Sequence, residues 1–101
     1  MADEPAGNDR ILREAAARLS LHRFEQERGV AYSGPLGDMF VAGYIDGAAG
    51  AALERAVAHR EVANERLAAF TYGWCRGHAD LGGHRPAYRP VERWLSRRSA
   101  G

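Results

Sequence analysis

The sequence predicts an all-α protein: a small helical bundle with a helical hairpin or a long bent helix over residues 38–80, expected to self-associate. Apolar residues recur at helical spacing near the N-terminus. No proline interrupts the chain from Asp38 to Leu81, where alanine and charged residues dominate. Nineteen of the 101 residues are alanine, so large apolar side chains are few. A chain with so thin a core is expected to bury further surface against a second copy or another protein.

The first expected helix covers residues 9–27, after a tail, residues 1–8, that is expected to be disordered. Asn8 or Asp9 can cap it, and Gly29 ends it. Its apolar residues at helical spacing are Ile11, Leu12, Ala15, Ala16 and Leu19. Leu21 and Phe24 drift off this stripe, which predicts a kink or break near Ser20. A loop over residues 29–37 follows, and Asp38 caps the next helix.

An internal repeat lies within residues 38–80. Phe40-Val-Ala-Gly43-Tyr44-Ile-Asp-Gly47 returns 30 residues later as Phe70-Thr-Tyr-Gly73-Trp74-Cys-Arg-Gly77. Each glycine costs a helix about 1 kcal/mol relative to alanine, so two matched sets indicate close packing. Chance similarity, or an ordinary core with aromatic residues at helical spacing, remains the alternative interpretation.

The repeat suggests that two antiparallel helices, roughly 38–58 and 61–80, pack with every large ring opposite a glycine. The pairs would be Phe40 with Gly77, Gly43 with Trp74, Tyr44 with Gly73, and Gly47 with Phe70. The turn is expected at Ala58 and His59, with Gly50 and Asn64 as other places where the chain could turn. The second arrangement is a long bent helix that pairs with another copy of the chain.

The repeat also resembles the Phe-x-x-Gly-Tyr-x-x-Gly patterns of small helical accessory proteins from phages of high-GC bacteria. This resemblance covers only the two motifs that begin at Phe40 and Phe70. It implies an accessory or inhibitory factor of a phage or mobile element, and it transfers no activity and no catalytic residue.

The C-terminal third is electropositive, with six arginines against Asp80 and Glu92 between residues 71 and 101. A Gly/Pro loop is expected over residues 82–90 and a short basic helix over 90–98. The alternative function is a nucleic-acid-binding module, because arginine interleaved with aromatic rings can hold phosphates and stack on bases. Its candidate residues are Arg85, Tyr88, Arg89, Arg93, Trp94, Arg97 and Arg98.

The backbone expected around these arginines favours a simpler interpretation. Pro86 and Pro90 favour extended conformations before them, so only Arg93 and Arg97 are expected to share a helical face. Val91, Trp94 and Leu95 would form an apolar side that docks on the bundle. The C-terminal helix would then be a docked helix with a solvated basic face.

Metal binding and catalysis have weak support in the sequence. Cys75, His78, Asp80 and His84 lie within ten residues, and His59 or His22 could add a ligand. A single thiolate and no known metal-binding knuckle make a solvated histidine cluster the better interpretation. No glycine-rich phosphate loop or nucleophile elbow accompanies the possible thiolate pair of Cys75 with His78. We therefore expect no enzyme activity, no cofactor and no metal.

The expected setting is a cytoplasmic protein that does not enter a membrane. The N-terminal residues are acidic rather than apolar, and the most apolar window, residues 39–52, is too short to cross a bilayer. The lone Cys75 agrees with a reducing compartment. The expected function is a small non-enzymatic protein-interaction protein, with its partner on the alanine-rich faces between residues 48 and 69.

Overall fold

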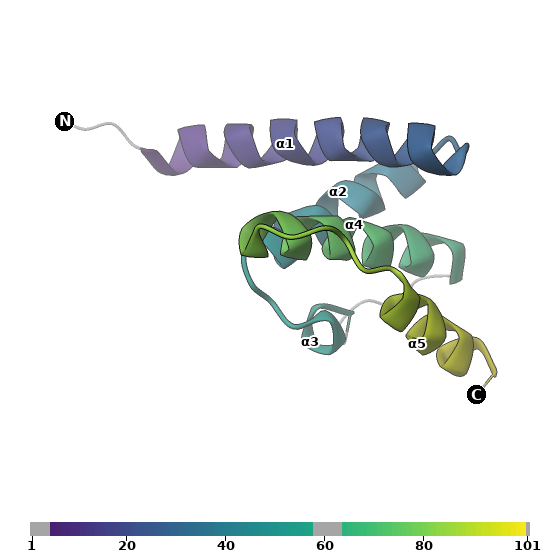
Figure 1. The fold of residues 1–101 in the computed structure, drawn as a ribbon. Helices are drawn as coiled ribbons and strands as arrows, with labels where there is room; N and C mark the ends of the chain where they lie inside the picture. Colours follow the sequence, from purple (N-terminus) through teal and green to yellow (C-terminus); the bar gives the residue numbers. More distant parts are fainter. Residues whose placement is uncertain (1–4, 58–63, 101) are drawn as a thin grey trace.

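The computed structural model describes residues 5–57 and 64–100, and over these residues the chain forms five helices and no strand (Figure 1). They are α1 (Pro5–Arg28), α2 (Pro35–Ala48), α3 (Leu53–Val57), α4 (Asn64–Gly82) and α5 (Arg89–Ala100). The predicted all-α class is confirmed. α2 and α4 form the central pair, α1 lies along one side of this pair, and α3 and α5 lie on the other side.

The two central helices touch backbone to backbone at the glycines of the repeat. A methyl carbon placed on Gly43 would lie 2.9 Å from the carbonyl carbon of Phe70. One placed on Gly47 would lie 2.8 Å from the backbone nitrogen of His78. Real Cβ atoms essentially never come within 3.0 Å of such atoms, so these positions require glycine.

The glycines of the second motif are used in the same way. A methyl carbon on Gly73 would lie 2.8 Å from the carbonyl carbon of Phe40, and one on Gly77 would lie 2.9 Å from that of Tyr44. The contact is therefore reciprocal, since each motif places its glycines against the other motif's backbone. Such close approach brings Cα–H groups near carbonyl oxygens, a weak but repeated attraction between helices.

α2 and α4 run parallel to each other. One turn forward along α2, from Gly43 to Gly47, moves the nearest carbonyl oxygen one turn forward along α4, from Phe70 to Trp74. An antiparallel pair would move that contact backward. Figure 1 shows the same relation, because both helices run in the same direction across the molecule.

The predicted antiparallel hairpin is therefore wrong. The nearest neighbours are Phe40 with Gly73, Gly43 with Phe70, Tyr44 with Gly77, and Gly47 with Trp74. Of the predicted pairs, only Gly43 with Trp74 recurs among these nearest contacts, because Gly43 lies between Phe70 and Trp74. The atoms that face the glycines belong to the backbone and not to the rings.

The parallel arrangement depends on the connection between the two helices. α2 ends at Ala48, ten residues before the predicted end of the first hairpin helix, and Gly50 adopts a left-handed φ of 84°. α4 begins at Asn64, at the end of the bundle where α2 also begins, and the described part of the connection holds the short α3. The predicted turn at Ala58 and His59 lies outside the described residues. Gly50 and Asn64, the other suggested turning points, lie near the two ends of this connection.

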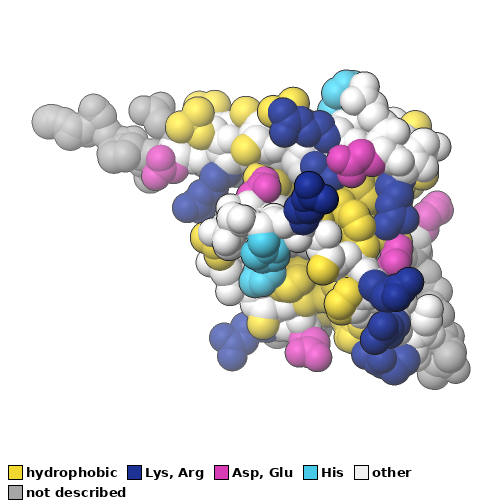
Figure 2. Space-filling view, in the orientation of Figure 1, with side chains coloured by type: hydrophobic (Ala, Val, Ile, Leu, Met, Phe, Trp, Pro, Cys, Tyr) yellow, Lys and Arg dark blue, Asp and Glu magenta, His cyan; other side chains and the backbone are white. Residues whose placement is uncertain are grey.

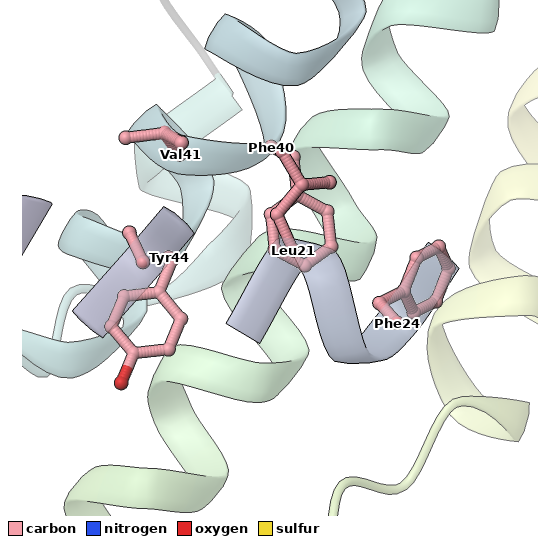
Figure 3. Packing of buried hydrophobic residues seen from close by; sticks show 6 residues of the cluster. Leu21, Phe24, Phe40, Val41 and Tyr44 are labelled. Carbon is pink, nitrogen blue, oxygen red and sulfur yellow. The ribbon is translucent and has the colours of Figure 1, made fainter. Parts of the chain in front are cut away.

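α1 is one unbroken helix, so the predicted kink or break near Ser20 is wrong. Its buried residues are Ala17, Ser20, Leu21 and Phe24. The ring of Phe24 lies 5.3 Å from that of Phe40 and 5.1 Å from that of Tyr72. Figure 3 shows how Leu21 and Phe24 join the buried cluster beside Phe40. The residues that seemed to leave the apolar stripe are the ones that dock this helix.

α5 begins one residue before its predicted start and packs its apolar side on the bundle. Val91 is buried, and Trp94 and Leu95 are half-buried against a cluster that includes Val57 and Phe70. α1 likewise begins earlier than expected, at Pro5 instead of Asp9. Among the described helices, none is both long and apolar enough to cross a membrane.

Candidate functional site

The outward face of α1 carries large apolar side chains that the fold leaves in solvent. Ile11 is 65% exposed, Leu12 66% and Leu19 51%. We call Ile11, Leu12, Ala15, Ala16 and Leu19, all exposed, the outer stripe. Figure 2 shows hydrophobic side chains along this edge of the molecule, over α1. Exposed apolar groups on one helix face are typical of an interaction surface.

The first half of α1 extends beyond the bundle. Residues 9–16 are all exposed, on every side of the helix, and burial begins at Ala17. Figure 1 shows this half reaching past α2 and α4. A short helical segment that buries little surface is marginally stable in water, so a partner along this segment would stabilise it.

The outer stripe is the pattern that predicted this helix, yet it is not the face that packs. The packed face holds Phe24, the bulkiest apolar residue of the segment, with Ala17 and Leu21. Two stripes on opposite faces of one helix are the signal that sequence reasoning missed. The departure of Leu21 and Phe24 from the first stripe predicts a break near Ser20, whereas these residues belong to a second apolar face of the same helix.

The C-terminal half of α1 is held in place by Arg28. The guanidinium of Arg28 lies 4.8 Å from the ring centre of Tyr88 and 5.2 Å from that of Tyr72. It also donates a hydrogen bond to Glu92 over 3.2 Å, and the Tyr72 hydroxyl donates to the same carboxylate over 2.8 Å. The hydrogen bond from Tyr72, followed by the pairing with Arg28, lowers the pKa of Glu92. This cluster joins α1, α4 and α5.

Arg76 of α4 makes a second polar link to α1. Its guanidinium donates to the Ser20 hydroxyl over 2.6 Å, to Glu27 over 3.1 Å and to the Tyr88 hydroxyl over 3.1 Å. The buried hydroxyl of Ser20 is thereby satisfied. These contacts hold the second half of α1 on the bundle and leave its outer stripe facing away.

The structure brings some of the predicted nucleic-acid residues together. α5 starts at Arg89, so Arg89, Arg93 and Arg97 share an outward face at four-residue spacing, where only the last two were expected to do so. All three are exposed, as are Arg85 and Arg98. Figure 2 shows basic side chains gathered over α5.

The aromatic members of that set are engaged within the chain. Tyr88 packs against the ring of Phe24 at 5.9 Å and lies beneath Arg28. Trp94 is half-buried, and the guanidinium of Arg98 lies 5.3 Å from its ring centre. The structure therefore offers a basic face without the free stacking rings that the sequence suggested.

A shallow groove of about 470 Å³ lies between α3, α4 and α5. Its apolar walls include Leu53, Trp74, Val91 and Trp94, and Arg97 lies at its edge. Trp74 is half-buried and its indole N–H donates to the carbonyl oxygen of Ala51 over 2.7 Å. The ring of Trp74 thus attaches the connection between α2 and α4 to the side of α4. It does not pack against a glycine of α2, as the sequence had suggested.

The candidate metal and catalytic residues have separate structural roles. Burial raises the pKa of Cys75 to about 12, and its thiol lies 3.6 Å from the carbonyl oxygen of Ala87. Asp80 accepts a hydrogen bond from the Tyr44 hydroxyl, and His78 stacks on Trp74 at 4.7 Å. Within the described part of the chain, no three His, Cys, Asp or Glu side chains form a group that could hold a metal ion. His59 lies outside that part. A buried thiol that stays protonated is a poor nucleophile and a poor ligand.

The faces between residues 48 and 69, expected to receive a partner, are partly used by the fold itself. Val57, Leu67 and Ala69 are buried in the core.

No protein family, curated protein or solved structure matches this chain. Over the described ranges 5–57 and 64–100, the fold is a small all-α bundle whose helix α1 has an exposed apolar face.

Proposed function

We propose that this chain is a small non-enzymatic protein-interaction protein that binds its partner through the outer stripe of α1. One observation carries the proposal: Ile11, Leu12 and Leu19 are each more than half exposed on one face of a helix that extends beyond its bundle. Burying such a side chain contributes about 1.5 to 3 kcal/mol. Burying three such side chains on one helix face would favour association by several kcal/mol.

The shape of this surface favours a protein partner. The outer stripe lies on the convex surface of a helix, which fits against another helix or into a groove of another protein. The repeat resembles motifs of small phage accessory proteins, so we further propose that the chain is an accessory or inhibitory factor of a phage or mobile element. Such a factor would act by binding, without chemistry of its own.

The test is capture with the purified chain as bait in a lysate of its native host. Leu12→Glu with Leu19→Glu should abolish capture, because two charges would have to be buried in the contact. The matched control is Leu81→Glu, which changes an exposed leucine on α4 that is 57% exposed. This control should bind as the unaltered chain does. Equal capture by all three proteins would contradict the proposal.

A second candidate function is nucleic-acid binding by the basic face of α5. The observation in its favour is that Arg89, Arg93 and Arg97 share an outward face while the carboxylate of Glu92 pairs inward with Arg28. Arginines on one face can follow a phosphate backbone.

This candidate is tested by binding of the full chain to single-stranded and duplex DNA and to RNA as salt rises from about 50 to about 200 mM. Arg93→Glu with Arg97→Glu should weaken binding and reduce the salt dependence by about one counterion per arginine removed. Arg55→Glu, at an exposed arginine of α3, is the control. Absence of binding at the lower salt concentration would exclude the candidate.

A further inference from the structure

We infer that the partner on the outer stripe is a second copy of this chain, whose α1 lies antiparallel to the first with the two-fold axis near Ala15 and Ala16. The inference rests on the proposed function and names the partner. Two-fold pairing brings the same surface of both copies together, so the surface must be complementary to itself. The outer stripe meets this requirement in its apolar residues and in its charges.

The apolar residues are placed evenly about the centre of the stripe. Leu12 precedes and Leu19 follows the Ala15–Ala16 centre by about the same number of residues. In the antiparallel pair, Leu12 of each copy therefore lies beside Leu19 of the other. Alanine at the centre lets the two helices approach closely, and the leucines on either side fill the remaining space.

The charges beside the stripe are also self-complementary. Asp9 lies seven residues before Ala16, and Arg23 lies seven residues after it. Seven residues are close to two helical turns, so all three lie on the same side of the stripe. An antiparallel pair then places Asp9 of each copy near Arg23 of the other, twice in the dimer. A parallel pair would place Asp9 of the two copies on opposite flanks of the interface and at the far end from Arg23, so neither charge would have a partner across the pair.

Other charged groups of α1 are already engaged within the chain. Arg18 pairs with Asp38 at 3.3 Å, and Glu27 pairs with Arg76 at 3.1 Å. Glu25 accepts a hydrogen bond from the backbone N–H of Tyr32. These contacts point toward the bundle. Arg10, Arg13 and Glu14 line a hollow beside Ile45 of α2, and Asp9 borders the same hollow at the edge of the outward face. Asp9, His22 and Arg23 are all exposed.

The bundle would not obstruct this pairing. α2 and α4 lie against the inner face of α1, which carries Ala17 and Phe24, and the outer stripe faces away from them. In the dimer the two bundles would therefore lie on opposite sides of a central helix pair. The exposed segment 9–16 of each copy would lie along the second half of α1 of the other. Each copy would therefore cover the outward side of a segment that the other copy's bundle leaves exposed.

The first measurement is the mass of the full chain in solution. The chain has a mass of 11.1 kDa, and we expect twice this mass at about 50 µM, with dissociation on dilution. Asp9→Arg or Arg23→Asp alone should weaken the dimer roughly tenfold, and the two together should restore it, because the charges are then exchanged. Arg55→Asp, on α3, should leave the dimer unchanged.

The second measurement tests the orientation by cysteine cross-linking, with the buried Cys75 left in place. Ala15→Cys lies near the two-fold axis and should form a disulfide-linked dimer on mild oxidation. Leu12→Cys should not link to itself, because its counterpart would lie about 10 Å along the helix axis, beyond disulfide reach. An equal mixture of Leu12→Cys and Leu19→Cys chains should link.

The outcomes separate the inference from the proposed function. A monomer at all concentrations, with host-protein capture still lost in the Leu12→Glu and Leu19→Glu variant, would overturn the second copy and keep the interaction function. A monomer with no such capture would overturn both. A dimer that tolerates the charge reversals, or that links through Leu12→Cys alone, would overturn the antiparallel pairing.

Discussion

Gly73 of α4 lies directly against the backbone of Phe40 of α2, so closely that a methyl carbon on Gly73 would lie 3.1 Å from the Cα atom of Phe40 and 2.8 Å from its carbonyl carbon. The reciprocal contact, Gly43 against Phe70, is equally close. Two copies of one motif thus pack in parallel and in register. The first glycine of each motif makes room for the backbone of the other motif's phenylalanine, and the second glycine makes room for the backbone of Trp74 or Tyr44.

Gly73→Ala tests this contact, and we expect a net loss of about 2 kcal/mol in the free energy of unfolding. The added methyl must push two helix backbones apart, which outweighs the roughly 1 kcal/mol that alanine gains in helix propensity. Denaturant titration followed by circular dichroism measures the loss. Gly82→Ala is the control, because the added methyl there meets only the exposed side chain of His84. Equal stability of the two variants would show that the close contact is not needed.

Trp74→Ala is expected to cost about 2 kcal/mol, because it removes a half-buried ring and its hydrogen bond to Ala51. Trp74→Phe should cost about 1 kcal/mol, since it loses the hydrogen bond and keeps most of the ring contact. Thermal and denaturant unfolding give both values. If Trp74→Phe were as destabilising as Trp74→Ala, the ring contact would contribute nothing to holding the connection between α2 and α4 against α4.

Glu92→Gln is expected to destabilise the fold slightly at neutral pH and not in acid. The folded chain holds the pKa of Glu92 below its ordinary value of 4.5, chiefly through the Tyr72 hydroxyl. The charged carboxylate therefore stabilises the fold above pH 4.5, and this stabilisation is lost as pH falls through the lowered pKa. The unfolding temperatures of the two proteins should differ by about 4 °C or less at pH 7 and converge as pH falls through the lowered pKa of Glu92. A constant difference across this range would contradict the pairing.

Cys75 should react with thiol reagents only after unfolding. Its side chain is 4% exposed, and burial raises its pKa to about 12, so the reactive thiolate is scarce at pH 8. The reaction of the folded chain should be at least roughly a hundredfold slower than in denaturant. Ser33→Cys, at an exposed loop position, supplies a fast-reacting control thiol in the same protein. Rapid labelling of Cys75 in the folded chain would contradict its burial beside the backbone of Ala87.

The repeat could be recognised from the sequence, but the direction of the helix pair could not. A Phe-x-x-Gly-aromatic-x-x-Gly motif fits glycine-mediated packing in either direction, because its glycines lie on one face whichever way the partner helix runs. The direction depends on residues 49–63, the connection between the end of α2 at Ala48 and the start of α4 at Asn64. Their alanine-rich sequence carries no strong turn signal, so a tight hairpin and a crossover were equally compatible with it.

The sequence by itself determined the helical class and the approximate position of the main helices, because helix periodicity, glycine and proline act locally. It also indicated that Gly43, Gly47, Gly73 and Gly77 serve close packing. Only the tertiary structure decided which side of α1 is buried and in which direction α4 runs beside α2. α1 has two apolar faces, and the fold buries the one with Phe24 because that ring completes the aromatic cluster of Phe40, Tyr72 and Tyr88. The other face, with Leu12 and Leu19, is left exposed.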